Sequence, residues 1–306
     1  MNPMKNKAAR RRSFLSHCGE KDWLRETAMR IVFLLAACVS VVCVALICVF
    51  LLANGLPAIA EIGPLKFLTG RTWKPGADIY GIFPMIMGSV YVTGGALLLG
   101  VPIALLTAVY LAYFCPDGLY RLLKPAVELL AGIPSVVYGF FGIVVLVPFV
   151  RTISEPLDGK GNSIATASIL LAIMILPTII GVVEPALRAV PSSIHEGALA
   201  LGATHERAVF TAVAPAASIG ILAGIVLGVG RAMGETMAVI MVAGNQARMP
   251  KGILQGVRTL TGNIVIEMGY AAGLHREALI ATGVVLFVFI LLINLAFSAL
   301  KGRDRG

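Results

Sequence analysis

Two charged residues, Arg231 and Glu235, stand in an otherwise apolar stretch of this 306-residue chain. Residues four apart share one face of a helix, so this spacing predicts that the two side chains pair. A charge in apolar surroundings is costly unless it faces protein or a water-filled cavity and has a partner. A guanidinium donates two parallel hydrogen bonds, which suits a tetrahedral oxyanion. We therefore expect Arg231 to meet an oxyanion in transit, with Glu235 holding the arginine between passages.

Small residues lie on the same predicted helix face as this pair. Gly220 and Gly224 fall within about 20° of Arg231, and Gly228 within about 60°. Such a face either lets helices approach closely or leaves room for a path. Because Arg231 lies roughly 24 Å along a helix from Pro215, the alternative is a structural ion pair near the outer membrane interface.

Two hydroxyl side chains are further candidates for the same pathway. Thr236 directly follows Glu235, and Ser135 follows Pro134 within an apolar run. A proline breaks the helix and frees backbone groups, and irregular backbone at membrane depth is tolerated where it lines a cavity. For Ser135, a kink packed against neighbouring helices is the alternative.

Motifs for enzymatic chemistry are missing from the sequence. It has no Gly-x-x-x-x-Gly-Lys-Ser/Thr phosphate loop and no His-Glu-x-x-His zinc motif. Its four histidines fall in separate loops: His17, His195, His205 and His275. We predict no catalytic residue, no metal site and no enzymatic activity, so any energy for transport comes from a partner protein or an ion gradient.

The composition indicates a membrane protein. Hydrophobic residues make up 58% and charged residues 13% of the chain, against about 25% charged in soluble domains. This excludes a soluble domain and a disordered chain. A membrane-crossing helix needs about 20 apolar residues, and six runs qualify, which predicts an all-α protein with six transmembrane helices: Ile31–Leu52, Ile79–Pro116, Leu129–Val150, Gly161–Val183, Ala208–Gly230 and Ala278–Leu300.

The distribution of basic residues predicts the orientation. The net charge is +9, and 15 of the 25 Lys and Arg residues fall inside if both termini are cytoplasmic. The first apolar run is longer than the hydrophobic region of a cleaved signal peptide, so it is predicted to be an anchor. The expected organisation is a basic tail (1–30), an anchor helix (31–54), an outer loop (55–86), a five-helix core (87–300) and a cytoplasmic tail (301–306).

One predicted cytoplasmic segment, Glu184–Thr211, is long and rich in helix signals. Pro191 starts a short helix and Gly202 breaks it before a second one. An amphipathic helix on the membrane surface is the alternative. Leu199 and Leu201 make too small an apolar face for that role, which favours a protein partner.

This segment resembles the coupling loop of ABC importer permeases. The shared positions are Glu196, Gly197, Ala198 and Gly202, followed by Ala212, Ala214 and Pro215. Gly197 stands where the family usually has Ala, and Ala212 and Ala214 replace the usual Ile and Leu. The resemblance implies that a groove on a cytoplasmic ATPase receives the loop, through Glu196, Gly197, Ala198, Gly202, Ala203 and Thr204.

Longer strings, over residues 60–300, resemble the PstC permease subunits of phosphate ABC importers. They are Phe67–Gly70 with Trp73 and Pro75, Tyr80–Pro84, Glu128–Gly139 and Gly230–Val239. The resemblance implies a MetI-like core in a bacterial inner membrane and phosphate as substrate. It also implies a PstA-like second permease, a PstB-like ATPase dimer that binds ATP and Mg²⁺, and a PstS-like binding protein, periplasmic or lipid-anchored. No cofactor in this chain and no nucleic-acid partner are expected.

Two other functions stay open at this point. The substrate alternative is another tetrahedral oxyanion such as sulfate or molybdate, and the class alternative is a secondary transporter, although no inverted repeat is evident. In the outer segment Gln246–Arg276, four bases against Glu267 predict electrostatic attraction of an anion; a solvated loop without such a role is the alternative. These bases are Arg248, Lys251, Arg258 and Arg276.

Overall fold

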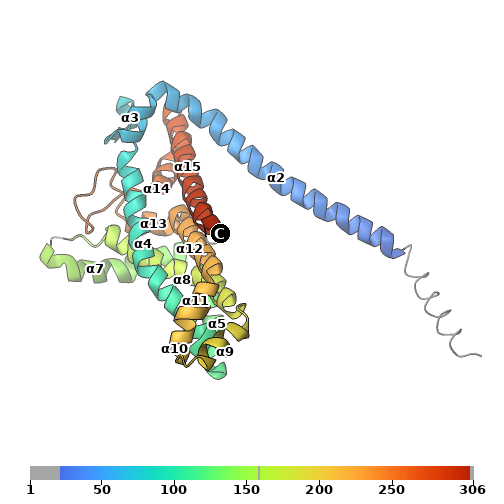
Figure 1. Ribbon diagram of the computed structural model, residues 1–306. Coiled ribbons are helices and arrows are strands. Elements are labelled where there is room, and N and C mark those ends of the chain that lie inside the picture. Colours follow the sequence, from blue (N-terminus) through green and yellow to red (C-terminus); the bar gives the residue numbers. More distant parts are fainter. Residues whose placement is uncertain (1–20, 158, 304–306) are drawn as a thin grey trace, which may run out of the picture. The chain divides into compact units, whose positions relative to one another are not determined.

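The computed structural model of the chain describes residues 21–157 and 159–303 (Figure 1). Most of the predicted basic tail, including His17, and the last three residues lie outside this part. The described residues fall into two units, divided after Ala53. They are helical except for one two-stranded hairpin and the connections between elements.

The first unit holds most of helix α2 (Lys21–Ile62). Its stretch Arg25–Ile62 is long and apolar enough to cross a membrane, as predicted for the anchor. Its large apolar side chains from Ile31 to Phe50 are exposed, which suits a helix surrounded by lipid.

The centre of the second unit is helix α8 (Ile164–Arg188), which packs against α4 (Phe83–Val109) and α12 (Ser218–Gly234). Leu170, Met174 and Ile175 of α8 are almost fully buried. Gly220, Gly224 and Gly228 of α12 lie against this helix. A Cβ at Gly224 would lie 2.6 Å from Val183 Cγ2, so the small-residue face serves close helix packing rather than an open path.

Two of the predicted spans are interrupted. Helix α5 (Asp117–Gly132) ends before Pro134, and α6 (Ser135–Phe141) continues through the π-helical turn η3 (Gly142–Leu146) into α7 (Val147–Ser154) and η4 (Glu155–Leu157). The predicted break is confirmed. The third crossing stretch is Ser135–Ser154, so its predicted start at Leu129 is wrong: that residue belongs to α5.

The fifth predicted span is bent. Helices α10 (His205–Ala208), η5 (Val209–Val213) and α11 (Ala214–Ala216) meet α12 at an angle of 74°. The described residues therefore contain five helices able to cross a membrane, or six with this bent pair as one span. The last of the six is in α15 (Leu274–Arg303).

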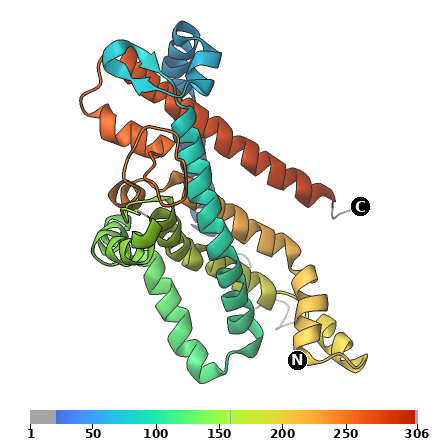
Figure 2. The same cartoon turned by 90° about the vertical axis from the view of Figure 1, so that its left-hand side faces the viewer.

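The segment predicted as an outer loop is ordered into small elements. They are α3 (Pro64–Thr69) and a hairpin of β1 (Trp73–Lys74), the 3₁₀ turn η1 (Pro75–Ala77) and β2 (Ile79–Tyr80). Phe67, Trp73 and Tyr80 form a second apolar core with residues of α14 (Leu260–Met268) and α15. Figure 2 shows this group at one end of α4, whereas α9 (Ser192–Ala200) and α10 lie at the other.

Candidate functional site

The two residues of the predicted ion pair lie on either side of a helix break. Arg231 is in the last turn of α12, which ends at Gly234, and Glu235 has extended backbone angles (φ −68°, ψ 128°). The Glu235 carboxylate accepts hydrogen bonds from the backbone N–H groups of Thr236 (3.1 Å) and Ala238 (3.2 Å). It thereby satisfies free donors at the start of α13 (Met237–Val242). Because the helix ends before Glu235, the predicted ion pair is wrong: no ion pair joins these two described residues.

The Arg231 guanidinium keeps an unsatisfied donor. Its Nε is buried and has no hydrogen-bond partner among the described residues. The phenol of Tyr138 on α6 interacts electrostatically with Arg231. A buried donor without a partner costs about 1–3 kcal/mol. An anion beside Arg231 would remove that cost.

Two broken helices meet beside this arginine. Helix α6 packs against α13 so closely that a Cβ at Gly139 would lie 3.1 Å from Ala238 Cα. Ser135 is the first residue of α6 and is half-buried. The hydroxyl of Thr236 donates to the carbonyl of Gly234 (3.1 Å). The predicted pathway residues therefore come from adjoining elements.

Sequence reasoning missed one neighbour of this break. Thr261, near the start of α14, donates its hydroxyl hydrogen to the carbonyl of Glu235 (3.3 Å). Thr259 caps α14 by accepting from the N–H of Gly262. A Thr-x-Thr pair before an apolar helix is a recognisable cap signal, but its contact with residue 235 is set by the fold.

The coupling-loop segment forms two short helices, as predicted. Helix α9 ends before Gly202, which has φ +87°, and Thr204 caps α10 by accepting from the N–H of Arg207 (3.3 Å). Glu196 and Gly197 are exposed. Leu201, directly after α9, has 91% of its surface exposed. These residues form a compact projection with exposed side chains.

Two of the histidines that seemed scattered in the sequence are in contact. His195 Nε2 of α9 lies 3.1 Å from His205 Nδ1 of α10. His205 Nε2 lies 3.2 Å from the carbonyl oxygen of Tyr113, at the end of the π-helical turn η2 (Tyr110–Phe114) that extends α4. The ring of His205 also packs edge-on against Phe114. The projection is thereby joined to α4.

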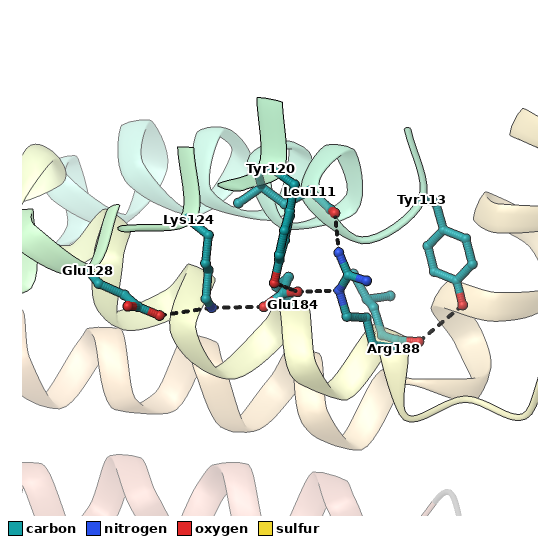
Figure 3. A network of polar contacts seen from close by, with 8 residues as sticks. Leu111, Tyr113, Tyr120, Lys124, Glu128, Glu184 and Arg188 are labelled. Atoms are coloured by element: carbon teal, nitrogen blue, oxygen red, sulfur yellow. Dashed lines mark hydrogen bonds and ion pairs between the residues drawn. The ribbon is translucent and has the colours of Figure 1, made fainter. Parts of the chain in front are cut away.

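A charged network lies close to this projection (Figure 3). Glu184 of α8 is buried and accepts from Lys124 (2.9 Å), Tyr120 (3.1 Å) and Arg188. Burial alone would lower the pKa of Lys124, but the bond to Glu184 and neighbouring negative charges raise it above its usual value. The contact of Lys124 with Glu128, four residues further along α5, is longer at 3.7 Å.

The same network bonds to the end of α4. Arg188 donates to the carbonyl of Leu111 (2.8 Å), and the Tyr113 hydroxyl donates to the carbonyl of Leu187 (3.1 Å). Because α8 runs to Arg188, the prediction of a loop beginning at Glu184 is wrong. Glu184 is charged and follows an apolar run, so the sequence alone does not distinguish a buried helical carboxylate here from the first residue of a loop.

On the far side of the core, another buried carboxylate ties three segments together. Glu267 Oε1 accepts from Arg258 (2.5 Å), and its Oε2 accepts from Trp73 Nε1 (2.8 Å) and lies 2.9 Å from His275 Nε2. Burial alone would raise the pKa of Glu267, but these donors hold it below its usual value. Arg258 is therefore paired with Glu267 within the fold, and attraction of an anion by the outer segment stays a prediction.

Comparison with known proteins places the chain in a family. Residues 100–304 match the model of the binding-protein-dependent transport system inner membrane component. A probable ABC transporter permease protein, YqgH of Bacillus subtilis, is 36% identical over 91% of this chain and 93% of its own length. The phosphate transport system permease protein PstC of Mesorhizobium japonicum is 35% identical over 84% of both chains. PstC of Haemophilus influenzae is 35% identical over 73% of this chain and 76% of its own.

Solved structures confirm the predicted MetI-like fold. The MetNI methionine ABC transporter has a chain with a TM-score of 0.53 and 21% identity that covers 72% of this chain and 92% of its own. A chain of a bacterial ABC transporter involved in alginate import has a TM-score of 0.58 and 15% identity, and the match covers 92% of this chain and 98% of its own. This chain therefore belongs to the binding-protein-dependent inner membrane components, the non-catalytic, multi-pass permease subunits of ABC importers.

Proposed function

We propose that this chain is the permease subunit of an importer that carries inorganic phosphate across the inner membrane. The geometry that carries the proposal is the buried Nε of Arg231, without a partner among the described residues, beside the break between α12 and α13. A guanidinium binds a phosphate oxyanion well. The PstC names of relatives such as those of Mesorhizobium japonicum and Haemophilus influenzae support phosphate over sulfate or molybdate.

In this proposal, Arg231, Glu235, Thr236 and Ser135 border the pathway. Glu235 acts by fixing the backbone of the break, since its carboxylate is held by N–H groups of α13. The arginine then has no competing carboxylate when phosphate arrives. This differs from the expectation that Glu235 releases and recaptures the arginine.

The proposed partners follow from the same family membership. A PstA-like permease would complete the pathway, a PstB-like ATPase dimer would hydrolyse ATP, and a PstS-like binding protein would deliver phosphate. The ATPase would receive the projection that contains Glu196, Gly197, Ala198, Gly202, Ala203 and Thr204. Both termini would then be cytoplasmic, as the basic residues predict.

The test is uptake of labelled phosphate by the reconstituted complex that carries Arg231→Gln. We expect uptake to fall by about tenfold or more, because one charge-assisted contact is lost, and Arg231→Lys to restore part of it. The amount of assembled complex is measured alongside. Normal uptake by a fully assembled Arg231→Gln complex would remove this residue from the pathway.

A further inference from the structure

A cavity lies where the α7–α8 and α13–α14 connections meet, and it is not part of the site at Arg231. Its volume is about 410 Å³. Two cations, Lys160 and Arg248, and three amides, Asn162, Gln246 and Gln255, line it. We call it the basic cavity. Its wall also includes the backbone of Gly244, just beyond the C-terminal end of α13.

The walls of the basic cavity are held by backbone hydrogen bonds. The first N–H groups of α8, from Ile164 and Ala165, donate to the carbonyls of Gln255 (3.0 Å) and Ile253 (2.9 Å). Val257 N–H donates to the carbonyl of Ala243 (2.8 Å). The connection after α13 is thus attached to the most buried helix of the core, which makes the cavity a built feature of the fold.

Both glutamines of the cavity have their amide orientation fixed. Arg248 Nε donates to Gln246 Oε1 (2.9 Å), and the Lys251 backbone N–H donates to Gln255 Oε1 (3.0 Å). An amide NH₂ could not accept either bond, so the oxygens must face these donors. This leaves the two neutral NH₂ groups as hydrogen-bond donors, in addition to the two cations of the cavity.

Negative charge is absent from the described lining of this cavity. Arg248 has a neutral partner in Gln246, unlike Arg258, which pairs with Glu267. Glu155 lines a neighbouring cavity together with Lys160, but the two are not within ion-pair distance in the described part of the chain. A small, concave, donor-rich surface suits an anion with several acceptor oxygens.

We infer that the basic cavity binds a tetrahedral oxyanion, inorganic phosphate, before the anion reaches Arg231. The inference rests on the proposed function. The cavity and the break at Glu235 lie at opposite ends of α13, whose six residues span about 9 Å. The cavity is therefore a receiving site one short helix away from the arginine.

The direct test is equilibrium dialysis of labelled phosphate against the purified permease–ATPase complex, without binding protein and without ATP. The double variant Lys160→Gln/Arg248→Gln is expected to bind phosphate at least about tenfold more weakly, because two charge-assisted contacts are lost. The exposed Lys251→Gln is the matched control and keeps wild-type affinity.

Three results would overturn the inference. The first is equal phosphate affinity in the double variant and the wild type, and the second is no saturable phosphate binding by the wild type. The third is a double variant that still binds phosphate but whose ATPase activity is no longer stimulated by the binding protein. The last would make the cavity a docking site for an acidic protein surface. Uptake by the wild-type complex tests the proposed function separately. If the complex imports another oxyanion instead of phosphate, the proposed function fails, and the same dialysis experiment with that oxyanion then tests binding in the basic cavity.

Discussion

His195 Nε2 lies 3.1 Å from His205 Nδ1, and this contact, together with the carbonyl of Tyr113, sets which nitrogen of each neutral ring donates. A carbonyl can only accept, so His205 donates from Nε2 to Tyr113 and, when neutral, accepts at Nδ1. His195 then donates from Nε2. The two imidazoles thus join α9, α10 and the end of α4 in one chain of hydrogen bonds.

We predict that His205→Ala weakens the coupling of ATP hydrolysis to uptake. The substitution removes both imidazole bonds, so a pull on the projection no longer reaches Tyr113 directly. Substrate uptake per ATP hydrolysed should fall several-fold in the reconstituted complex. Glu206→Gln, at the next and exposed position, is the control. An unchanged ratio in His205→Ala would show that the contact carries no coupling.

A second prediction concerns the buried carboxylate of α8. Glu184→Gln leaves Lys124, whose side chain is only 20% exposed, without its closest ionic partner. We expect the free energy of unfolding to fall by about 2–3 kcal/mol. This is less than for a fully buried ion pair, because Arg188, the other ionic partner of Glu184, is partly exposed. Glu128→Gln removes the exposed 3.7 Å contact and should cost less than about 0.5 kcal/mol. Equal effects in thermal unfolding would contradict the assignment of Glu184 as the main partner.

The third prediction is a pH dependence from Glu267. Its pKa is below the usual value of 4.5 in the folded chain, so its contribution is fully present above about pH 4.5 and is lost as the pH falls through the folded value. The stability difference between wild type and Glu267→Gln should therefore shrink below pH 4.5 in thermal unfolding. The exposed Glu61→Gln controls for removal of one carboxylate. A stability difference between wild type and Glu267→Gln that grows as the pH falls would contradict this prediction.

A fourth prediction compares two glycines of α12. At Gly224 a Cβ would lie 2.6 Å from Val183 Cγ2 and 3.3 Å from the carbonyl of Ile179, whereas at Gly230 nothing lies within 4 Å. Gly224→Ala should destabilise the permease by about 1–3 kcal/mol through overpacking. Gly230→Ala should be neutral or stabilise it by up to about 1 kcal/mol. Similar melting temperatures for the two variants would mean that α12 does not pack on α8 as described.

The sequence allowed the helical class and the six apolar spans to be predicted because membrane crossing imposes a length and a composition. The break at Pro134 and the two short helices around Gly202 were also predictable, since proline and glycine act locally. The start of the third crossing stretch was wrong by several residues, because the last turn of α5, residues 129–132, is apolar and merges with it in the sequence.

Contacts between distant segments were beyond sequence reasoning. The spacing of Arg231 and Glu235 predicts a pair only if the helix continues, and the helix ends at Gly234. Tyr120 and Lys124, two partners of Glu184, lie 64 and 60 residues away along the chain, and Trp73, a partner of Glu267, lies 194 residues away. The sequence does not show which bases are neutralised, so Arg258 and Arg248 look alike until the fold places Glu267 beside one of them.

The central claim is phosphate import, and uptake in proteoliposomes tests it most directly. The complex of this permease with its second permease, ATPase and binding protein is supplied with ATP inside the reconstituted cytoplasmic compartment and labelled phosphate on the binding-protein side. We predict ATP-dependent accumulation of phosphate that a tenfold excess of sulfate or molybdate leaves nearly unchanged, about tenfold being a stringent excess for a selective site. Strong inhibition by sulfate or molybdate, or no accumulation of phosphate by a complex that hydrolyses ATP, would contradict the claim.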